Sequence, residues 1–305
     1  MTLWLGSMCT VVISSDEVAR QMFKNHDVVL AGRKIYEAMK GDYGNEGSII
    51  TAQYGAHWRM LRRICTTEFF VTSRLDAMRG VRSRCIDRMV QFIEEAGGGN
   101  CTKAIDVGRF FFLMSFNLIG NLMFSKDLLD PQSERGAKFF YHAGKRRMKS
   151  MDNGGSDEEK RKDFLDVLLE FRGDGPEEPS TFSSRTINVI VFVRRDPKTW
   201  EDPLAFKPDR FLEPNMVDYK GHHFEFIPFG SGRRMCPAMP LASRVLPLAL
   251  GSLLYSFDWV LADGIKAEDM DMSERMGITL RKSVPLKALP MPYKGYKNNI
   301  SACVA

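Results

Sequence analysis

One short segment of the chain has the residue types and spacing to bind a metal through sulfur. It extends from Phe229 to Ala238 and reads Phe-Gly-Ser-Gly-Arg-Arg-Met-Cys-Pro-Ala. A cysteine binds haem iron as a thiolate, which the protein must keep deprotonated, shielded from water and supplied with backbone N–H donors. Gly230 and Gly232 permit a turn tight enough to direct such donors toward sulfur. The segment therefore predicts that Cys236 is an axial ligand of haem iron.

The neighbours of Cys236 also favour an anionic sulfur. Phe229 can cover the sulfur with its ring, and Arg234 can pair with a haem propionate. A helix predicted to begin near Pro240 places its positive end close to the thiolate. The alternative is a glycine-rich turn beside a structural cysteine, which is the usual role of a lone cysteine. Because many positions of the segment suit a thiolate, we favour the haem ligand.

Helices are expected to dominate the elements around this segment. The expected helices span residues 15–24, 56–66, 74–95, 105–123 and 240–255. The first opens with a possible capping box at Ser14–Glu17, and Pro247 predicts a kink in the last. Within 56–66, the helical repeat places Trp58 and Arg62 on one face. That face is a second candidate for contact with the cofactor.

The expected strands are short. The stretch from Thr2 to Val12 breaks at Gly6-Ser7 and predicts two strands, while 278–280 and 284–289 are expected to pair near the carboxyl end. Ile187 to Val193 is apolar and β-branched, which suggests a short buried strand, although its length and pattern leave a helix open. The expected fold class is therefore mainly α with small β-sheets (α+β).

Composition narrows the class of protein. The chain has 305 residues, 44% hydrophobic and 27% charged, which indicates a packed globular protein. The net charge of +5 comes from basic residues interleaved with acids, so no nucleic-acid partner is expected. The densest cationic group consists of Arg74, Arg79, Arg82, Arg84 and Arg88. We interpret this group as the solvated face of one helix.

The remaining cysteines, the histidines and the most apolar segment indicate no further site. Six cysteines without a C-x-x-C pair predict a reducing compartment, and Cys85 belongs to an apolar helical stripe. The five histidines lack metal-ligand spacing. Phe110–Phe124 is shorter than the roughly 20 residues of a bilayer span, so we expect a buried core helix there and no transmembrane segment.

The segment around Cys236 resembles the haem loop of the cytochrome P450 family. The family pattern F-x-x-G-x-R-x-C-x-G is matched by Phe229, Gly232, Arg234 and Cys236. Ala238 stands at the final glycine, a replacement that adds one methyl group and is found among plant members. By this resemblance, Cys236 is the axial ligand of the haem iron, and the other matched residues belong to the haem site.

Two upstream motifs resemble the same family in the same order. Trp58 and Arg62 resemble the W-x-x-x-R of a helix that hydrogen-bonds a haem propionate. Arg210 resembles the arginine of the P-x-R-F signature, which implies a structural role in a triad. The segments 110–121, 163–169 and 248–253 are similar to plant microsomal members.

The resemblance implies an activity, a cofactor and partners. Such members bind haem (iron protoporphyrin IX), and a cytochrome reductase delivers electrons from NADPH. They use dioxygen to hydroxylate a small apolar secondary metabolite, such as a terpenoid or an alkaloid. The resemblance also implies the cytosolic face of the endoplasmic reticulum membrane. This chain shows no amino-terminal membrane anchor, which would make it cytosolic or peripheral.

Two family elements have no match in the sequence. The central distal helix with its A-G-x-[DE]-T motif is missing, so we identify no catalytic residue, and the E-x-x-R helix that partners Arg210 is missing too. Residues 186–192 resemble the start of the central helix, yet 193–197 resemble the later meander. We therefore expect one incomplete domain over 1–305, with deletion junctions near 144–145 and 192–194.

These departures leave alternatives open. The chain is either an active monooxygenase or a catalytically inactive, truncated or mis-spliced member, at most a haem-binding module. Arg210 without its partners would be costly to bury, by about several kcal/mol, unless it turns to solvent. Arg59 and Arg63 share a helix face that fits either docking of an acidic reductase surface or plain solvation.

Overall fold

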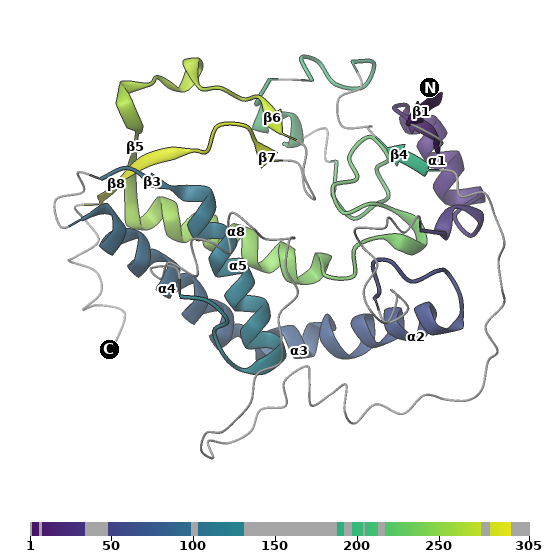
Figure 1. Cartoon of the computed structure of the whole chain (residues 1–305), viewed down its shortest axis with the longest axis horizontal. Helices are drawn as coiled ribbons and strands as arrows, with labels where there is room; N and C mark the ends of the chain where they lie inside the picture. The colour runs from purple at the N-terminus through teal and green to yellow at the C-terminus, as the bar shows by residue number, and fades with distance from the viewer. Residues whose placement is uncertain are drawn as a thin grey trace. The chain divides into compact units, whose positions relative to one another are not determined.

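The chain is mainly helical, with small sheets (Figure 1). The computed structural model describes residues 2–5, 8–33, 48–98, 103–130, 188–191, 197–203, 205–212, 217–275 and 281–293. The expected fold class, mainly α with small β-sheets, is confirmed. Contacts divide the chain into two compact units: residues 1–71 with 172–240, and residues 72–171 with 241–305. The single-domain organisation stays a prediction, and both expected junctions lie outside the described residues.

The first unit contains a three-stranded sheet. Its strands are β1 (Thr2–Leu5), β2 (Met8–Ile13) and β4 (Asn188–Val191), in the order β1-β2-β4. The predicted hairpin is confirmed, since β1 and β2 are antiparallel. β4 runs parallel to β2, so the strand alternative is confirmed for 188–191 and the helix alternative is wrong there. Two β-branched valines and an isoleucine in β4 explain the preference.

Helix α1 (Asp16–Asn25) follows this hairpin. Ser15 is the N-cap, but its side chain makes no capping hydrogen bond, so the predicted capping box is wrong. The helix begins one residue later than the box requires, which puts Glu17 at the second helical position instead of the third. Buried Ala19 packs with Phe224, and this pair anchors α1 to the chain that precedes the cysteine.

Helix α2 (Ala56–Ile64) continues into a single π-helical turn, η3 (Cys65–Phe69). The helix predicted over 56–66 is confirmed, with Trp58 and Ile64 buried. In η3 the hydroxyls of Thr66 and Thr67 donate to carbonyls one turn back, which competes with regular helical bonding. Between α1 and the cysteine lie the short 3₁₀ turns η1 (Val29–Ala31) and η5 (Pro208–Phe211).

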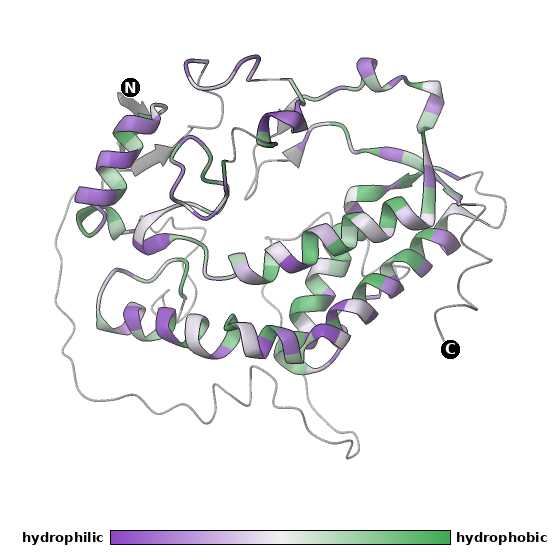
Figure 2. Ribbon diagram, turned by 180° about the vertical axis from the view of Figure 1, so that it is seen from behind, coloured by the Kyte–Doolittle hydropathy of each residue, from purple (hydrophilic) through white to green (hydrophobic). Residues whose placement is uncertain are grey.

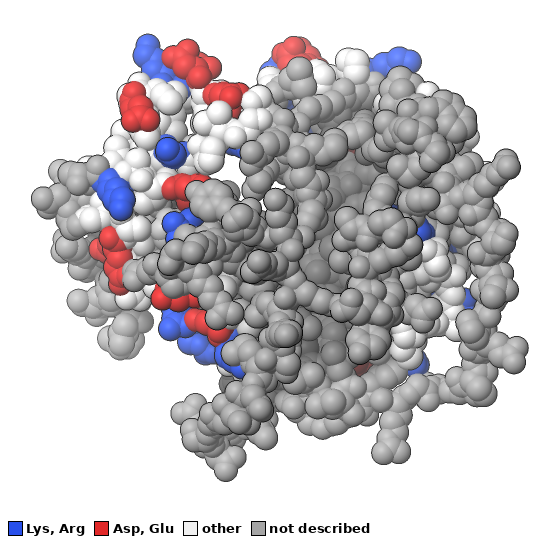
Figure 3. All heavy atoms as spheres, viewed as in Figure 1, with Lys and Arg blue, Asp and Glu red and all other residues white. Residues whose placement is uncertain are grey.

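The second unit opens with α3 (Thr72–Ala77) and α4 (Arg79–Gly97). The single helix predicted over 74–95 is wrong, because the chain breaks at Met78. Arg82 is buried and donates to the carbonyl of Leu75, which the break leaves without a helical partner. Arg82 therefore does not belong to a solvated face, in contrast to its exposed neighbours. On the face drawn in Figure 3, basic and acidic side chains of the described residues lie interspersed.

Strand β3 (Ile105–Asp106) leads into α5 (Val107–Phe124), which packs against α4. The Asp106 side chain accepts a hydrogen bond from the Arg109 amide and caps the helix. By length and composition α5 could cross a membrane, but one face is buried inside the protein, as expected of a core helix. Asn117 bonds the backbone of Leu129 and closes the turn after α5.

The carboxyl-terminal part of this unit contains α8 (Met239–Ser256) and two small sheets. Their strands are β5 (Phe257–Leu261), β6 (Glu274–Arg275), β7 (Arg281–Lys282) and β8 (Lys287–Pro292), with the 3₁₀ turns η7 (Ala262–Gly264) and η8 (Ala267–Asp269). β8 pairs with β3 and β5. The predicted pairing of 278–280 with 284–289 stays a prediction, because 278–280 lie outside the described residues. Segment 163–169 also lies outside them.

α8 is apolar on more than one side. It continues as one helix through Pro247, as the sequence predicts apart from the kink, which stays a prediction. Val245, Ala249 and Leu253 are buried, whereas the leucines at 246, 250 and 254 are exposed. Figure 2 shows hydrophobic residues (green) along both α5 and α8.

Candidate functional site

The cysteine loop, Phe229–Cys236, is a compact turn in the first unit. Gly230 and Gly232 have φ angles of 73° and 65°, in the left-handed region that favours glycine. The Cys236 amide donates to the Phe229 carbonyl at 2.9 Å, and the Met235 amide donates to Gly232 at 3.1 Å. The predicted tight turn at the two glycines is confirmed. These bonds hold the residue that carries the sulfur against the start of the loop.

A second layer of chain supports the loop. The Ser231 hydroxyl is buried and donates to the Gly221 carbonyl at 2.8 Å. Gly221 has a φ of 83°, and a Cβ there would lie 3.1 Å from the Gly230 carbonyl oxygen and 3.3 Å from the Met235 sulfur. Only glycine permits this approach. Sequence reasoning missed both residues, and the dipeptide Lys220-Gly221 is the weak turn signal that could have indicated them.

The Arg234 side chain binds three backbone carbonyls, those of Ala31, Ile49 and Ala52, which together we call the carbonyl cradle. Its guanidinium donates to Ala31, Ile49 and Ala52 at 2.8, 3.3 and 2.7 Å. It also lies 4.3 Å over the ring of Trp58, whose own N–H donates to Ile49. Burial, followed by the charges of Arg33 and Arg62, lowers the pKa of Arg234 to about 10. The structure thus places Arg234 and Trp58 together, although they are far apart in sequence.

Arg62 reaches the same loop from α2. Its guanidinium donates to the carbonyl of Met235, the residue before Cys236. Burial lowers the pKa of Arg62, and the nearby thiols of Cys65 and Cys236 oppose that shift. The structure therefore brings Arg62 beside the candidate iron ligand, which connects the two motifs that the sequence singled out.

The arginines of this site are suited to an acidic ligand. Among the residues that the structure describes, neither Arg62 nor Arg234 pairs with a carboxylate. Burial also lowers the pKa of Arg33, so all three guanidiniums have lost part of their hydration. Arg234 uses three of its five N–H groups on carbonyls, which leaves donors for a further acceptor. Charge-assisted bonds to the two propionates of haem fit this donor set.

Arg233 has other partners than Arg234. Its Nε lies 3.1 Å from a carboxylate oxygen of Asp27, and its Nη1 lies 3.2 Å from the Tyr54 hydroxyl. The guanidinium also lies 5.6 Å from the centre of the Tyr54 ring. Sequence reasoning missed Asp27 and Tyr54, because no local spacing connects them with residue 233.

Phe229 and Cys236 are both half-buried, and Cys236 is a free thiol. The ring of Phe229 packs edge-on against Tyr219, with 5.9 Å between ring centres. Helix α8 begins at Met239, three residues beyond Cys236, so its positive end is close to the sulfur along the chain. The proposed shielding of the sulfur by Phe229 stays a prediction.

Arg210 lies outside this cluster and is bonded locally. Its side chain donates to the carbonyls of Lys207, Asp202 and Ala205 at 3.0, 3.2 and 3.1 Å, and it lies 5.6 Å from the centre of the Trp200 ring. These four neighbours satisfy the guanidinium locally, so the cost expected for an unpaired arginine is avoided. The structural role of Arg210 in the family's triad stays a prediction.

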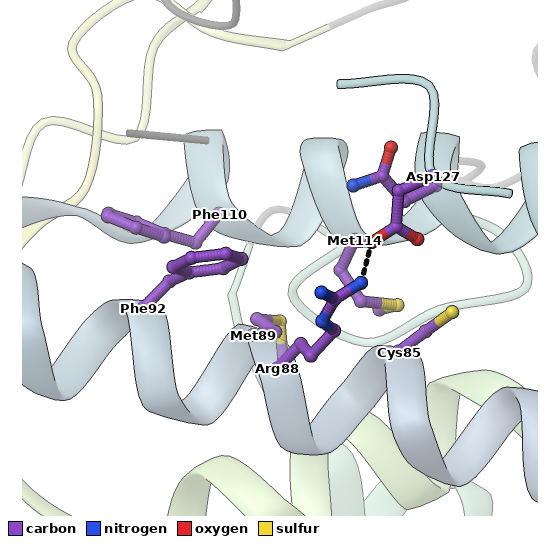
Figure 4. Close-up of a pocket in the computed structure, with 8 residues that line it drawn as sticks. Cys85, Arg88, Met89, Phe92, Phe110, Met114 and Asp127 are labelled. Atoms are coloured by element: carbon purple, nitrogen blue, oxygen red, sulfur yellow. Dashed lines mark hydrogen bonds and ion pairs between the residues drawn. The ribbon is translucent and has the colours of Figure 1, made fainter. Parts of the chain in front are cut away.

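A pocket in the second unit is separate from the cysteine loop. It is lined by Cys85, Arg88, Met89, Phe92, Phe110, Met114, Asn117 and Asp127. In Figure 4, Phe92 and Phe110 lie at one end and Cys85 and Met114 at the other, with the Arg88–Asp127 ion pair beside them. Burial, followed by the charge of Asp127, raises the pKa of Cys85 to about 11. Cys85 is thus a neutral thiol in an apolar stripe, as the sequence predicted.

The described residues contain no cluster of three or more His, Cys, Asp or Glu side chains that could hold a metal ion. Arg59 and Arg63, on the neighbouring face of α2, are exposed, and the Arg59 guanidinium lies 5.9 Å from the centre of the Tyr54 ring. A single cysteine in a cationic loop is therefore the arrangement that the first unit offers, and it suits an anionic macrocycle with a metal that accepts sulfur.

Comparison with known proteins gives a family match over most of the chain. The family model for cytochrome P450 matches residues 1–151 and 187–288. The iridoid oxidase of Catharanthus roseus is 32% identical over 439 aligned positions, which cover 94% of this chain and 84% of that protein. Cytochrome P450 76A2 of Solanum melongena is 30% identical, covering 94% and 86%. The geraniol 8-hydroxylase of Catharanthus roseus is 28% identical, covering 95% and 86%.

These alignments are longer than the chain itself, so the relatives contain internal residues without a counterpart here. Solved structures agree on the fold. A zebra fish cytochrome P450 with abiraterone has a TM-score of 0.71 at 17% identity, covering 96% of this chain and 95% of that chain. The same kind of protein with progesterone has a TM-score of 0.68 at 17% identity, covering 95% and 96%.

Proposed function

Because the chain belongs to the cytochrome P450 family, whose members are haem-containing monooxygenases, we propose that it holds haem through the Cys236 thiolate and hydroxylates a small apolar plant metabolite. The observation that carries the proposal is the convergence of Arg62, Trp58 and Arg234 on the cysteine loop. These residues come from segments about 180 positions apart, and they meet without a carboxylate among the described residues. That arrangement suits a dianionic cofactor with an iron that needs sulfur.

Each residue has a distinct role toward the cofactor. Cys236 provides the sulfur ligand, and its amide is already engaged with Phe229, so the residue is held before the cofactor arrives. Arg62 and Arg234 provide charged donors for the propionates, and Trp58 orients Arg234 by stacking. Gly232 permits the turn. The bound haem supplies the oxygen chemistry at its iron, which the thiolate makes more electron-rich.

The proposed substrate is a small terpenoid. Relatives in plants include an iridoid oxidase and a geraniol 8-hydroxylase, whose names describe the oxidation of an iridoid and the hydroxylation of geraniol. The family also implies a redox partner and a small organic substrate. We propose that the partner is an NADPH-dependent cytochrome reductase and that the protein acts at the cytosolic face of the endoplasmic reticulum membrane. Exposed Arg59 and Arg63 offer positive charge for an acidic partner surface.

A haem-binding module without turnover is the second candidate. It is favoured by the break in the family match between residues 151 and 187, and by alignments longer than the chain. The carbonyls that bind Arg234 lie in the matched part before that break, and the cysteine loop lies in the matched part after it. A chain that keeps both parts and lacks a distal wall would bind haem and leave it open to water.

Spectroscopy of the haem-loaded protein tests the proposal. The purified chain is reconstituted with haem, reduced and exposed to carbon monoxide, and a thiolate-type Soret band is expected. Cys236→Ser should abolish this band, whereas Cys65→Ser, which removes the other thiol near Arg62, should keep it. Absence of the band in the wild-type protein contradicts the proposal.

Turnover then separates the two candidates. With a plant cytochrome reductase, NADPH and geraniol as the probe, a monooxygenase should form a hydroxylated product that mass spectrometry detects. Stoichiometric haem without NADPH consumption across a panel of monoterpenes would favour the module.

A further inference from the structure

We propose that Asp27 is a positioning residue for the cysteine loop and acts through Arg233. The proposal rests on the assignment of Cys236 as the iron ligand made above. Asp27 lies just beyond the end of α1, more than 200 positions before the loop, and nothing in its sequence surroundings connects it with the cofactor. Its contacts with the loop carry the inference.

The first contact is electrostatic. The Nε of Arg233 lies 3.1 Å from the Asp27 carboxylate, whose side chain is 22% exposed. Tyr54 holds the other side of the same guanidinium through its hydroxyl at 3.2 Å and its ring at 5.6 Å. Arg233 is therefore fixed from two directions by residues of two other segments.

The second contact is steric. A Cβ on Gly232 would lie 3.3 Å from a ring carbon of Phe23 and 3.4 Å from the Cβ of Asp27. The loop therefore approaches the end of α1 at the residue before Arg233 so closely that a side chain there would be crowded. Phe23 in turn stacks on Phe224, with 6.2 Å between ring centres, beside the buried Ala19. The end of α1 is consequently a packed element that lies next to the loop.

The two adjacent arginines of the loop also have separate partners. Arg233 and Arg234 are neighbours in the 3₁₀ turn η6 (Gly232–Arg234), yet Arg233 turns to Asp27 and Arg234 turns to the three carbonyls. Of the arginines around the loop, Arg233 is the one to which the described residues offer a carboxylate. Without Asp27, the guanidinium of Arg233 would be free to compete for the carbonyl cradle, and the turn that leads to Cys236 would lose its fixed register.

Hydrogen exchange of the full chain without haem tests the proposal directly. The amides of Met235 and Cys236 donate to Gly232 and Phe229, so their exchange reports opening of the loop. Asp27→Asn and Arg233→Gln should each accelerate this exchange about two- to fivefold, the range for losing one partly exposed ion pair. The reversed pair, Asp27→Arg with Arg233→Asp, should restore the wild-type rate, and Asp27→Glu should restore most of it.

The matched control is Asp202→Asn, which breaks the exposed Asp202–Lys207 pair of the same unit and should leave exchange at 229–236 unchanged. Unchanged exchange in both single variants overturns the proposal. So does faster exchange in one and slower exchange in the other, because that result indicates an effect of charge alone. If a single variant does not fold, the reversed pair decides. A reversed pair that folds and exchanges at the wild-type rate supports the proposal, and a reversed pair whose exchange stays faster overturns it.

A spectroscopic readout connects the loop with the sulfur. In the haem-loaded protein, Asp27→Asn and Arg233→Gln should both lower the share of the carbon monoxide complex that has a thiolate-type Soret band, at equal total haem. An unchanged share overturns the positioning role. A wild-type chain that takes up no haem would contradict the proposed function, while the exchange result would still decide whether Asp27 holds the loop.

Discussion

Cys85 and Cys236 lie in opposite environments within one chain. Cys85 is 6% exposed in α4, among methionines and phenylalanines, and burial raises its pKa to about 11. Cys236 is half-buried in a glycine turn, with the guanidinium of Arg62 on the preceding carbonyl. In α4 the Cys85 thiol thus behaves as a small apolar side chain. The turn at Cys236 instead surrounds its sulfur with arginine side chains.

Arg88 beside the pocket and Arg234 in the cysteine loop also differ in their exposure and in their bonding partners. Arg88 pairs with Asp127 beside the pocket, where its side chain is 60% exposed. Arg234 is half-buried, donates to three carbonyls and stacks on Trp58. An exposed ion pair contributes little to stability, whereas a guanidinium that satisfies several buried acceptors organises the backbone around it. Arg234 therefore contributes more to the structure of the cysteine loop than the Arg88–Asp127 ion pair contributes to the structure of the pocket.

The largest expected effect comes from exchanging the thiols for hydroxyls. Cys236→Ser should remove the thiolate-type Soret band completely, because an alcohol is not ionised near neutral pH. Cys85→Ser should keep the band and lower stability by about 1 to 3 kcal/mol through the buried hydroxyl. Absorption spectra and urea denaturation measure the two effects. A full band in Cys236→Ser would remove the difference between the two cysteines.

Truncating the arginines should give the next largest difference. Arg234→Ala leaves three carbonyls without their donor and should lower the free energy of unfolding by about 2 to 4 kcal/mol. Arg88→Ala should cost less than about 1 kcal/mol, since its ion pair is exposed. Urea denaturation followed by circular dichroism compares the two variants. Equal losses would show that the cradle does not depend on Arg234.

The raised pKa of Cys85 predicts that the stability of the protein falls at alkaline pH. The pKa of Cys85 is raised from 9.0 to about 11 in the folded protein, so the neutral thiol contributes stability that is fully present below pH 9. That contribution should decline as the pH rises and be lost above pH 11, by up to about 3 kcal/mol. The difference in free energy of unfolding between wild type and Cys85→Ala, measured from pH 8 to 11, isolates this group. A constant difference would contradict the assignment.

Two glycine replacements should act in opposite directions. Gly232→Ala places a Cβ at a φ of 65° and 3.3 Å from Phe23, which should cost about 1 to 2 kcal/mol and weaken haem binding. Gly251 lies inside α8, and a Cβ there would meet nothing within 4 Å. Gly251→Ala should therefore raise stability by about 0.4 to 1 kcal/mol. Thermal unfolding of both variants shows whether the signs differ.

The apolar periodicity of the sequence predicted the helices well, but it did not predict the break at Met78. The helices over 56–66 and 105–123 follow from apolar spacing and are present within two residues. The helix over 74–95 is interrupted at Met78, and the buried guanidinium of Arg82 bonds the Leu75 carbonyl beside that break. A basic residue in a basic stretch gives no sign that it will turn inward. The capping box failed for a simpler reason, a shift of one residue at the start of α1.

The sequence predicted the candidate site at the level of motifs and missed what holds it. Phe229, Gly232, Arg234 and Cys236 stand within one decapeptide, and Trp58 and Arg62 stand one helical turn apart, so both groups were accessible to pattern reasoning. Asp27, Tyr54 and Gly221 support the loop from distant or irregular segments, where no spacing rule applies. The carbonyls that receive Arg234 have no side-chain signature at all.

The local bonding of Arg210 has a consequence for how the chain folds. Its three carbonyl partners lie three, five and eight positions away, and Trp200 is ten positions away. Contacts of such short sequence separation form quickly because little loop-closure entropy opposes them. The stretch from Trp200 to Phe211 therefore has low contact order, and it can organise early, before distant segments arrive. A chain that lost distant partners of this arginine would still assemble this corner at nearly its original rate.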